Sequence, residues 1–236
     1  MELSRVLAPF DNQKDVKITP LPSKPCNYAL IGKKGCGKTT LLLNLLERKE
    51  SPWYKYFHLI FLISPTASRD DKMADLVEDL GSQYYDTLDN HVLQEIMDRI
   101  DEHAARKKRR KKPAYLIIYD DCIHLIKGKN SRLMDLLATQ NRHRNVTNVY
   151  LLQKYNSFLP TLIRSNLDMV TFFKTSNNKE LESFLEEQNE DERVLRRLYE
   201  YATDEPYSFL HINNYFSKPV YYKRFDEIKF QKKSTQ

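Results

Sequence analysis

Residues 32–39 have side chains and a spacing that suit the binding of phosphate groups. Their sequence, Gly-Lys-Lys-Gly-Cys-Gly-Lys-Thr, matches the pattern G-x-x-x-x-G-K-[ST] and holds three of the chain's five glycines. Glycine allows the unusual backbone angles that let N–H groups point inward at phosphate oxygens. We expect Lys38 to contact the β- and γ-phosphates of ATP, and the Thr39 hydroxyl to bind Mg²⁺. The residues expected to contact the nucleotide are Gly32, Lys33, Lys34, Gly35, Cys36, Gly37, Lys38, Thr39 and Thr40.

A pair of acidic residues follows an apolar run later in the chain. Residues 115–119 are Tyr-Leu-Ile-Ile-Tyr, and Asp120 and Asp121 come directly after them. Because the carboxyl ends of parallel strands share one edge of a sheet, this pair is expected to lie beside the phosphate-binding loop. Asp120 is then placed to hold Mg²⁺ through water, and Asp121 to act as the general base that orients the attacking water. Together the two features predict an ATPase.

Three polar residues near a later strand are further candidates. Gln153 follows the predicted strand Val146–Leu152, where it is placed to contact the γ-phosphate or the water; an ordinary polar residue at a strand end is an equally good interpretation. Arg142 and Arg144 lie just before that strand, in a predicted loop. An arginine from a neighbouring subunit can neutralise charge in the transition state. A plain surface arginine is an equally good interpretation of either one.

The elements that must position these residues follow from the hydrophobic pattern. Apolar residues 28–31 predict a strand directly before the loop, and the Leu-rich residues 40–46 predict a helix directly after it. Strands that alternate with helices predict an α/β P-loop NTPase fold with a mostly parallel sheet covered on both faces. A C-terminal hairpin is expected, turning at Asn213-Asn214 or just beyond. The other predicted strands are 57–63, 115–119, Val146–Leu152, Met169–Phe173, 207–212 and 220–222, and the other predicted helices are 70–80, Asn90–Arg106, 133–140 and 179–202.

The order of the two motifs along the chain narrows the class further. The predicted strand at residues 57–63 comes between Lys38 and Asp120, with enough helical sequence to cross over the sheet. This arrangement is typical of ATPases that have an additional strand between the two motif strands, rather than of small nucleotide kinases.

Length and composition bound the organisation of the molecule. A chain of 236 residues is long enough to bury a substantial core, and we expect one domain over residues 26–236, after an extended, proline-containing lead-in over residues 1–25. No apolar stretch has the length of a bilayer span, and the first ten residues lack the apolar centre of a signal peptide. The three cysteines have no metal-binding spacing and suit a reducing compartment. These features predict a soluble protein.

Positive charge is concentrated in one short segment. The formal net charge is +6, yet residues 106–112 alone carry seven positive charges, so the rest of the chain is close to neutral. Blocks of like charge are often interaction segments or nucleic-acid contacts. An exposed helix end that contacts nothing specific is an equally good interpretation.

With these pieces together, the chain resembles the viral genome-packaging ATPases of the FtsK–HerA superfamily, which include the poxvirus and virophage packaging ATPases. The resemblance covers residues 28–175. Many ATPases of this type have Glu after the magnesium-binding Asp, whereas this chain has Asp121, as poxvirus-like members do. The residues that carry the resemblance are the loop 32–39, Leu62-Ile63-Ser64-Pro65-Thr66, Leu116-Ile117-Ile118-Tyr119-Asp120-Asp121, Arg142-His143 and Val149-Tyr150-Leu151-Leu152-Gln153.

This resemblance implies a ring of five or six subunits that threads double-stranded DNA into a preformed capsid. It also implies a capsid or virion vertex component as a partner, and a location in the host cytoplasm or at the site of virion assembly. Residues 124–132, which include Lys127, Lys129 and Arg132, are flexible and basic where pore loops of the family would face DNA. Residues 106–112 are the second candidate, for DNA phosphates or an acidic capsid component.

Two other functions remain open on the sequence. A cellular or plasmid DNA-transfer ATPase or helicase would be expected to add further domains or strand-separating elements. A nucleotide-gated regulatory module that hydrolyses poorly would be expected to lack Asp121 or the arginines, which are present. A metabolic kinase fits poorly because no separate lid or acceptor-binding segment is evident.

Overall fold

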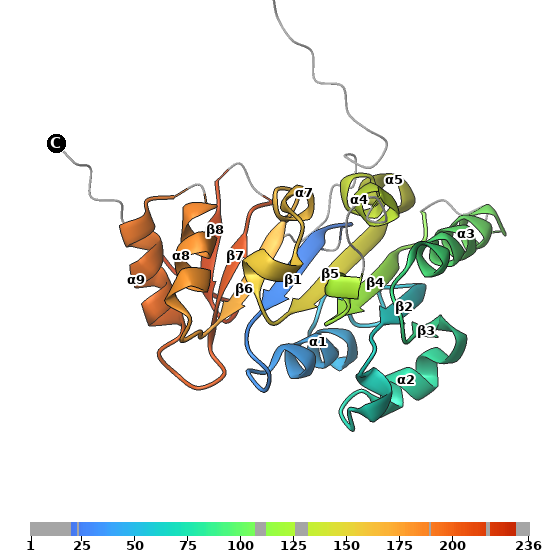
Figure 1. Ribbon diagram of the computed structural model, residues 1–236, viewed down its shortest axis with the longest axis horizontal. Helices are drawn as coiled ribbons and strands as arrows, with labels where there is room; N and C mark the ends of the chain where they lie inside the picture. The colour runs from blue at the N-terminus through green and yellow to red at the C-terminus, as the bar shows by residue number, and fades with distance from the viewer. Residues whose placement is uncertain are drawn as a thin grey trace, which may run out of the picture.

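The central feature of the molecule is a twisted β-sheet. The computed structural model describes residues 20–22, 24–106, 112–125, 132–188, 190–215 and 218–229. In these residues one nine-stranded sheet forms, with the order β3-β2-β4-β5-β1-β6-β7-β8-β9 (Figure 1). The strands from β3 to β6 in this order are parallel, and β7, β8 and β9 each run antiparallel to the strand before them. The predicted mostly parallel sheet with a C-terminal hairpin is confirmed.

The strands agree closely with the hydrophobic runs of the sequence. Two of them have the predicted bounds, and five others begin and end within two residues of the prediction. The two-residue strands at the sheet margins were not predicted, because two residues carry no periodic pattern. The strands are β1 (Asn27–Ile31), β2 (Leu59–Ile63), β3 (Tyr84–Tyr85), β4 (Tyr115–Asp120), β5 (Val146–Leu152), β6 (Met169–Phe173), β7 (Phe209–Asn213), β8 (Val220–Lys223) and β9 (Asp226–Glu227).

Helices cover both faces of the sheet, as Figure 1 shows. The core accordingly has two layers: Leu116 and Ile118 of β4 pack with residues of α1 and α2, whereas Ile117 and Tyr119 pack with residues of α3, α4, α8 and α9. Because both faces are buried, the central strands are apolar without interruption. The helices are α1 (Lys38–Glu47), α2 (Ala74–Leu80), α3 (Asn90–Arg106), α4 (Arg132–Thr139), α5 (Asn141–Arg144), α6 (Tyr155–Phe158), α7 (Thr161–Arg164), α8 (Asn178–Glu186) and α9 (Glu192–Ala202), with short 3₁₀ turns at Ala67–Arg69, Gly81–Gln83 and Ile123–Leu125.

The strand between the two motif strands is β5, not β2. β5 pairs in parallel with β1 on one side and with β4 on the other. β2, which comes between the motifs along the chain, pairs with the outer side of β4. The additional-strand arrangement is therefore present, but the additional strand is the one that directly precedes Gln153.

The charged segment over residues 179–202 forms two helices, so the prediction of a single helix is wrong. α8 ends at Glu186 and α9 begins at Glu192. The Asp191 side chain accepts hydrogen bonds from the N–H groups of Arg193 and Val194, 2.9 and 3.2 Å away, and so caps α9. The break lets each helix turn its apolar side toward the sheet.

The described end of the N-terminal lead-in is attached to the core. Leu21 is buried, and the carbonyl oxygen of Pro22 accepts a hydrogen bond from Nε1 of the buried Trp53, 3.1 Å away. The remainder of the predicted lead-in, residues 1–19 and 23, lies outside the described residues. Within the described ranges, no helix combines the length and apolar character needed to cross a bilayer.

Candidate nucleotide-hydrolysis site

The phosphate-binding loop joins the end of β1 to the first turn of α1. Gly35 and Gly37 have φ angles of 79° and 109°, which glycine adopts without strain. Gly32 is required by close packing, because a Cβ atom on it would lie 2.6 Å from Sγ of Cys36 and 2.8 Å from Cβ of Phe173. The loop therefore ends at the N-terminus of α1, where backbone N–H groups favour the binding of anions.

Lys38 places a positive charge inside this loop. The side chain is buried, and Nζ donates hydrogen bonds to the carbonyl oxygens of Gly32 and Lys33, 2.6 and 3.2 Å away. Lys38 is also the first residue of α1, where the helix dipole disfavours a cation. An anion bound in the loop would offset the unfavourable interaction between the Lys38 cation and the helix dipole, so this position suits a phosphate group.

The acid pair and the loop flank the same strand end. The N–H of Gly32 donates to the carbonyl of Leu152, 3.0 Å away, and the N–H of Asp121 donates to that of Leu151, 3.2 Å away. Both carbonyls belong to β5, so the loop and the acids lie one on each side of it. The predicted proximity of the two motifs is thus present in the structure.

Asp120 is fixed by a serine from the neighbouring strand. Oγ of Ser64, directly after β2, donates to Oδ2 of Asp120 at 2.8 Å and accepts from the N–H of Ala67 at 3.1 Å. Burial raises the pKa of the Asp120 carboxyl, and the hydrogen bond from Ser64 opposes this rise. In the sequence, Ser64 is part of the resemblance but has no predicted role, although a polar residue at the end of an apolar strand is a signal for such a position.

Asp121 and Gln153 contact each other directly. Asp121 has a φ of 47°, an uncommon conformation for a residue other than glycine. Nε2 of Gln153 donates a hydrogen bond to Oδ2 of Asp121, 2.6 Å away. The structure thus brings Gln153 to the candidate base, and its role in the site stays a prediction.

The two candidate arginines lie at the opposite edge of the sheet. Residues 141–144 form the short helix α5 in place of the predicted loop, and α5 precedes the amino end of β5. Arg142 pairs with Asp168 at 3.5 Å, and Arg144 pairs with Asp101 at 3.0 Å. Neither arginine is therefore brought to the phosphate-binding loop of its own chain.

The two candidate DNA-binding segments lie largely outside the described residues. Residues 107–111 and 126–131 are not among them, and neither are 216–217, next to the predicted hairpin turn. The described flanks place the first segment between α3 and the amino end of β4, and the second between the carboxyl end of β4 and α4.

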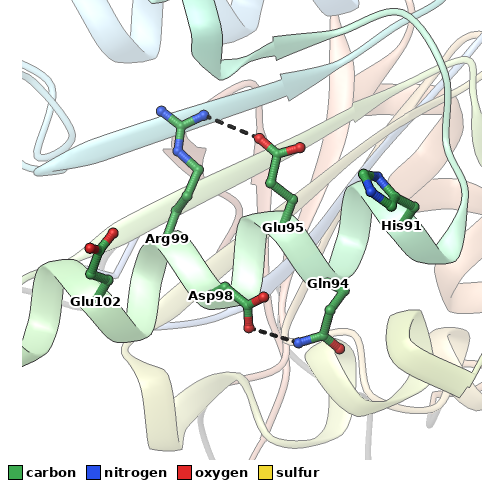
Figure 2. Close-up of a pocket in the computed structure, with 6 residues that line it drawn as sticks. All are labelled: His91, Gln94, Glu95, Asp98, Arg99 and Glu102. Atoms are coloured by element: carbon green, nitrogen blue, oxygen red, sulfur yellow. Dashed lines mark hydrogen bonds and ion pairs between the residues drawn. The ribbon is translucent and has the colours of Figure 1, made fainter.

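A pocket on the outer face of α3 is separate from this site. Figure 2 shows that its lining residues come from one helix, with Gln94 donating to Asp98 at 2.8 Å and Arg99 paired with Glu95 at 3.7 Å. Arg99 also donates to the hydroxyl of Tyr85 at 3.1 Å. The charged side chains Asp98, Glu95 and Arg99 are thus paired with other residues of the protein surface. The lining residues are His91, Gln94, Glu95, Asp98, Arg99 and Glu102.

The fold and the site define a P-loop NTPase of the additional-strand type. In proteins of this class, a loop, a lysine and an acidic residue of these types bind and hydrolyse a nucleoside triphosphate. The sequence profile of the poxvirus A32 protein family matches residues 13–198, and the chain belongs to this family. No curated protein matches the chain in sequence.

Solved structures share the fold at low sequence identity. The genome packaging NTPase B204 of Sulfolobus turreted icosahedral virus 2, in complex with ATPγS, is 16% identical, with a TM-score of 0.56 and coverage of 85% of this chain and 98% of that chain. The conjugation coupling protein TcpA of pCW3 is 13% identical, with a TM-score of 0.58 and coverage of 86% of this chain and 62% of that chain. ATPases 2 and 3 of EssC from Geobacillus thermodenitrificans are 14% identical, with a TM-score of 0.52 and coverage of 79% of this chain and 37% of that chain.

Proposed function

We propose that this protein hydrolyses ATP to drive double-stranded DNA into a viral capsid. The observation that carries the hydrolytic part is the contact between Gln153 and Asp121 beside the phosphate-binding loop. Membership of the poxvirus A32 family and the fold shared with a genome packaging NTPase support the packaging part. The fold shared with a conjugation coupling protein keeps DNA transfer between cells as the alternative.

Each site residue has a distinct task in this proposal. The loop and Lys38 bind the phosphates, and Asp121, oriented by Gln153, accepts a proton from the attacking water. The Thr39 hydroxyl and the Asp120 carboxylate are hard oxygen donors of the kind that Mg²⁺ prefers, so the residues fit this ion. Bound Mg²⁺ would neutralise charge on the phosphates. Ser64 keeps the Asp120 carboxylate in place for this role.

A ring of five or six subunits would complete the site. Arg142 and Arg144 lie at the edge of the sheet away from their own phosphate loop, so either one reaches a nucleotide only in a neighbouring subunit. Both side chains are already held, by Asp168 and Asp101, and would exchange these partners at the subunit boundary. The ring is soluble and acts at virion assembly, where it meets a capsid component.

DNA contact is assigned to the two basic segments. Residues 106–112 carry seven positive charges, and residues 124–132 follow the acid pair. A motor that moves any sequence needs phosphate contacts rather than base contacts. If residues 106–112 bind phosphates, replacing Arg109 and Arg110 with Gln will flatten the salt dependence of DNA binding.

Steady-state ATP turnover with and without duplex DNA, at low salt, tests the proposal. We expect DNA to raise the rate, and Asp121→Asn to lower it by about 10²-fold or more, since that is a typical contribution of a positioned base. Lys38→Ala should abolish turnover as well. Turnover that is indifferent to DNA would contradict the motor, and full activity of Asp121→Asn would contradict the assigned base.

A further inference from the structure

Tyr207 is an exposed aromatic residue in a conformation that is unfavourable for tyrosine. Its exposed fraction of 71% exceeds those of Leu125, Leu162 and Tyr201, the other large apolar side chains that are exposed among the described residues. Its φ angle is 60°. A tyrosine in the left-handed region is uncommon, and such strain is concentrated at functional sites.

The turn that carries Tyr207 is firmly held. The N–H of Ser208 donates to the carbonyl of Glu205 at 3.2 Å, which closes a turn with Pro206 second and Tyr207 third. With a positive φ, the third position of such a turn favours glycine. Arg224 secures the turn by donating to Oγ of Ser208 at 3.1 Å and to the Glu205 carboxylate at 3.2 Å. The ring of Tyr207 is therefore presented to solvent by a supported turn.

This turn lies beside the phosphate-binding loop. β7 runs antiparallel to β6, so its first residues lie at the carboxyl edge of the parallel strands, where Figure 1 shows the loop before α1 as well. A Cβ atom built on Gly37 would lie 3.6 Å from Cδ1 of Tyr207 and 3.7 Å from Cε1 of Phe173. The exposed ring of Tyr207 and the buried ring of Phe173 thus both border the last glycine of the loop.

We infer that Tyr207 is the stacking platform for the purine base of the bound nucleotide. This inference rests on the proposed function, which puts the phosphates in the loop. With the phosphates on the N–H groups that precede α1, the sugar and base must lie just outside the loop, within reach of a ring that borders Gly37. An exposed aromatic face there offers stacking to any purine.

The charges around the turn are compatible with this placement. Asp204 and Glu205 are acidic, but Nζ of Lys223 lies 2.7 and 3.1 Å from their carboxylates. Arg224 adds a second cation to Glu205. The turn is thereby largely neutralised, so it does not repel the phosphates of a nucleotide bound alongside.

The test compares a nucleotide with its base-free counterpart. Calorimetric titration of the full chain with ADP and with pyrophosphate, both with Mg²⁺, is carried out on wild type, Tyr207→Gly and Tyr207→Phe. Glycine suits the positive φ, so Tyr207→Gly should keep or raise the melting temperature. Tyr201→Ala removes an exposed ring of α9 whose centroid lies 4.9 Å from Nζ of Lys223, so it disturbs the surroundings of the turn while keeping the ring of Tyr207, and it is the matched control.

We expect Tyr207→Gly to weaken ADP binding by about tenfold, in the range for loss of one base–aromatic stack, with pyrophosphate binding unchanged. Tyr207→Phe and Tyr201→Ala should bind ADP as wild type does. Unchanged ADP affinity in Tyr207→Gly would overturn the inference, and so would an equal loss for both ligands.

A changed oligomeric state with unchanged ADP affinity would assign the ring to a neighbouring subunit instead. Wild-type protein that binds neither ligand would contradict the phosphate loop itself, whereas ADP binding without DNA-stimulated turnover would contradict only the motor.

Discussion

At the scale of single residues, the site depends on side chains that position other side chains. Ser64 holds Asp120, and Gln153 holds Asp121. The sequence predicted the loop, Lys38 and both acids, because fixed spacing and strand ends mark them. It did not predict the two hydrogen bonds, because each joins strands whose neighbourhood is set only by the order of strands in the sheet.

The Asp120 carboxylate is expected to be required for ATP turnover and to lower the stability of the folded protein. Burial raises the pKa of this carboxyl in the folded state. At a pH above the raised pKa, the buried carboxylate is charged and lowers the free energy of unfolding. We expect Asp120→Asn to raise the melting temperature at neutral pH and to abolish Mg²⁺-dependent turnover. The gain should shrink as pH falls through the raised pKa, since wild-type Asp120 then becomes neutral as well. Thermal unfolding against pH checks this, and a lower melting temperature for the variant at pH 7 would contradict it.

His211 should make the fold sensitive to mild acid. This buried residue of β7 contacts Oγ1 of Thr171 at 2.9 Å, and burial lowers its pKa from 6.5 to about 4. The folded state therefore keeps it neutral, while the unfolded chain takes up a proton as pH falls below 6.5. The resulting loss of unfolding free energy between pH 6.5 and 4 is about 3 kcal/mol.

Urea unfolding of wild type and His211→Gln over this pH range measures the effect. The variant should be less stable at pH 7 but should lack this component of the pH dependence. Parallel curves for the two proteins would show that His211 does not account for it.

At the scale of elements, long periodic segments were predictable and short ones were not. The bounds of α3, β5 and β6 follow from the apolar pattern alone. The break between α8 and α9 was missed because the charged sequence continues the helical pattern across it. The position of β5 was missed for another reason: chain order does not determine strand order.

The cap at Asp191 should stabilise α9 measurably. Its side chain accepts from two N–H groups of the first turn. Asp191→Ala should lower the free energy of unfolding by about 1 kcal/mol, a typical value for a lost N-cap. Asp191→Asn keeps an acceptor and should change stability little. Chemical denaturation checks both, and equal losses in the two variants would assign the effect to charge rather than to capping.

At the scale of the whole molecule, the two edges of the sheet have different tasks in our proposal. The nucleotide lies at the carboxyl edge, and the α5 arginines lie at the amino edge. The sequence predicted both groups of residues, but their separation became evident only from the strand order. The separation is what makes a neighbouring subunit necessary for arginine to reach the nucleotide.

Mixing of inactive subunits tests this arrangement. Arg142→Ala and Lys38→Ala proteins should each be inactive alone, because the first lacks the donated arginine and the second lacks a working loop. Mixed rings should regain ATP turnover, since an intact loop then meets an intact Arg142. Arg142→Ala should remain folded, because the Arg142 side chain is largely exposed and the largely buried Asp168 keeps its hydrogen bond from the N–H of Asn27, 2.8 Å away. Mixtures that stay inactive would contradict an arginine supplied by the neighbour, and the same experiment with Arg144→Ala decides between the two residues.

If ATP hydrolysis moves the protein along duplex DNA, displacement of a third strand will report that movement. A fluorescent oligonucleotide is bound as a triplex near the end of a long duplex, and its release is followed after ATP is added. We expect release that requires ATP and is absent in Lys38→Ala and Asp121→Asn. DNA-stimulated hydrolysis without release of the third strand would contradict it.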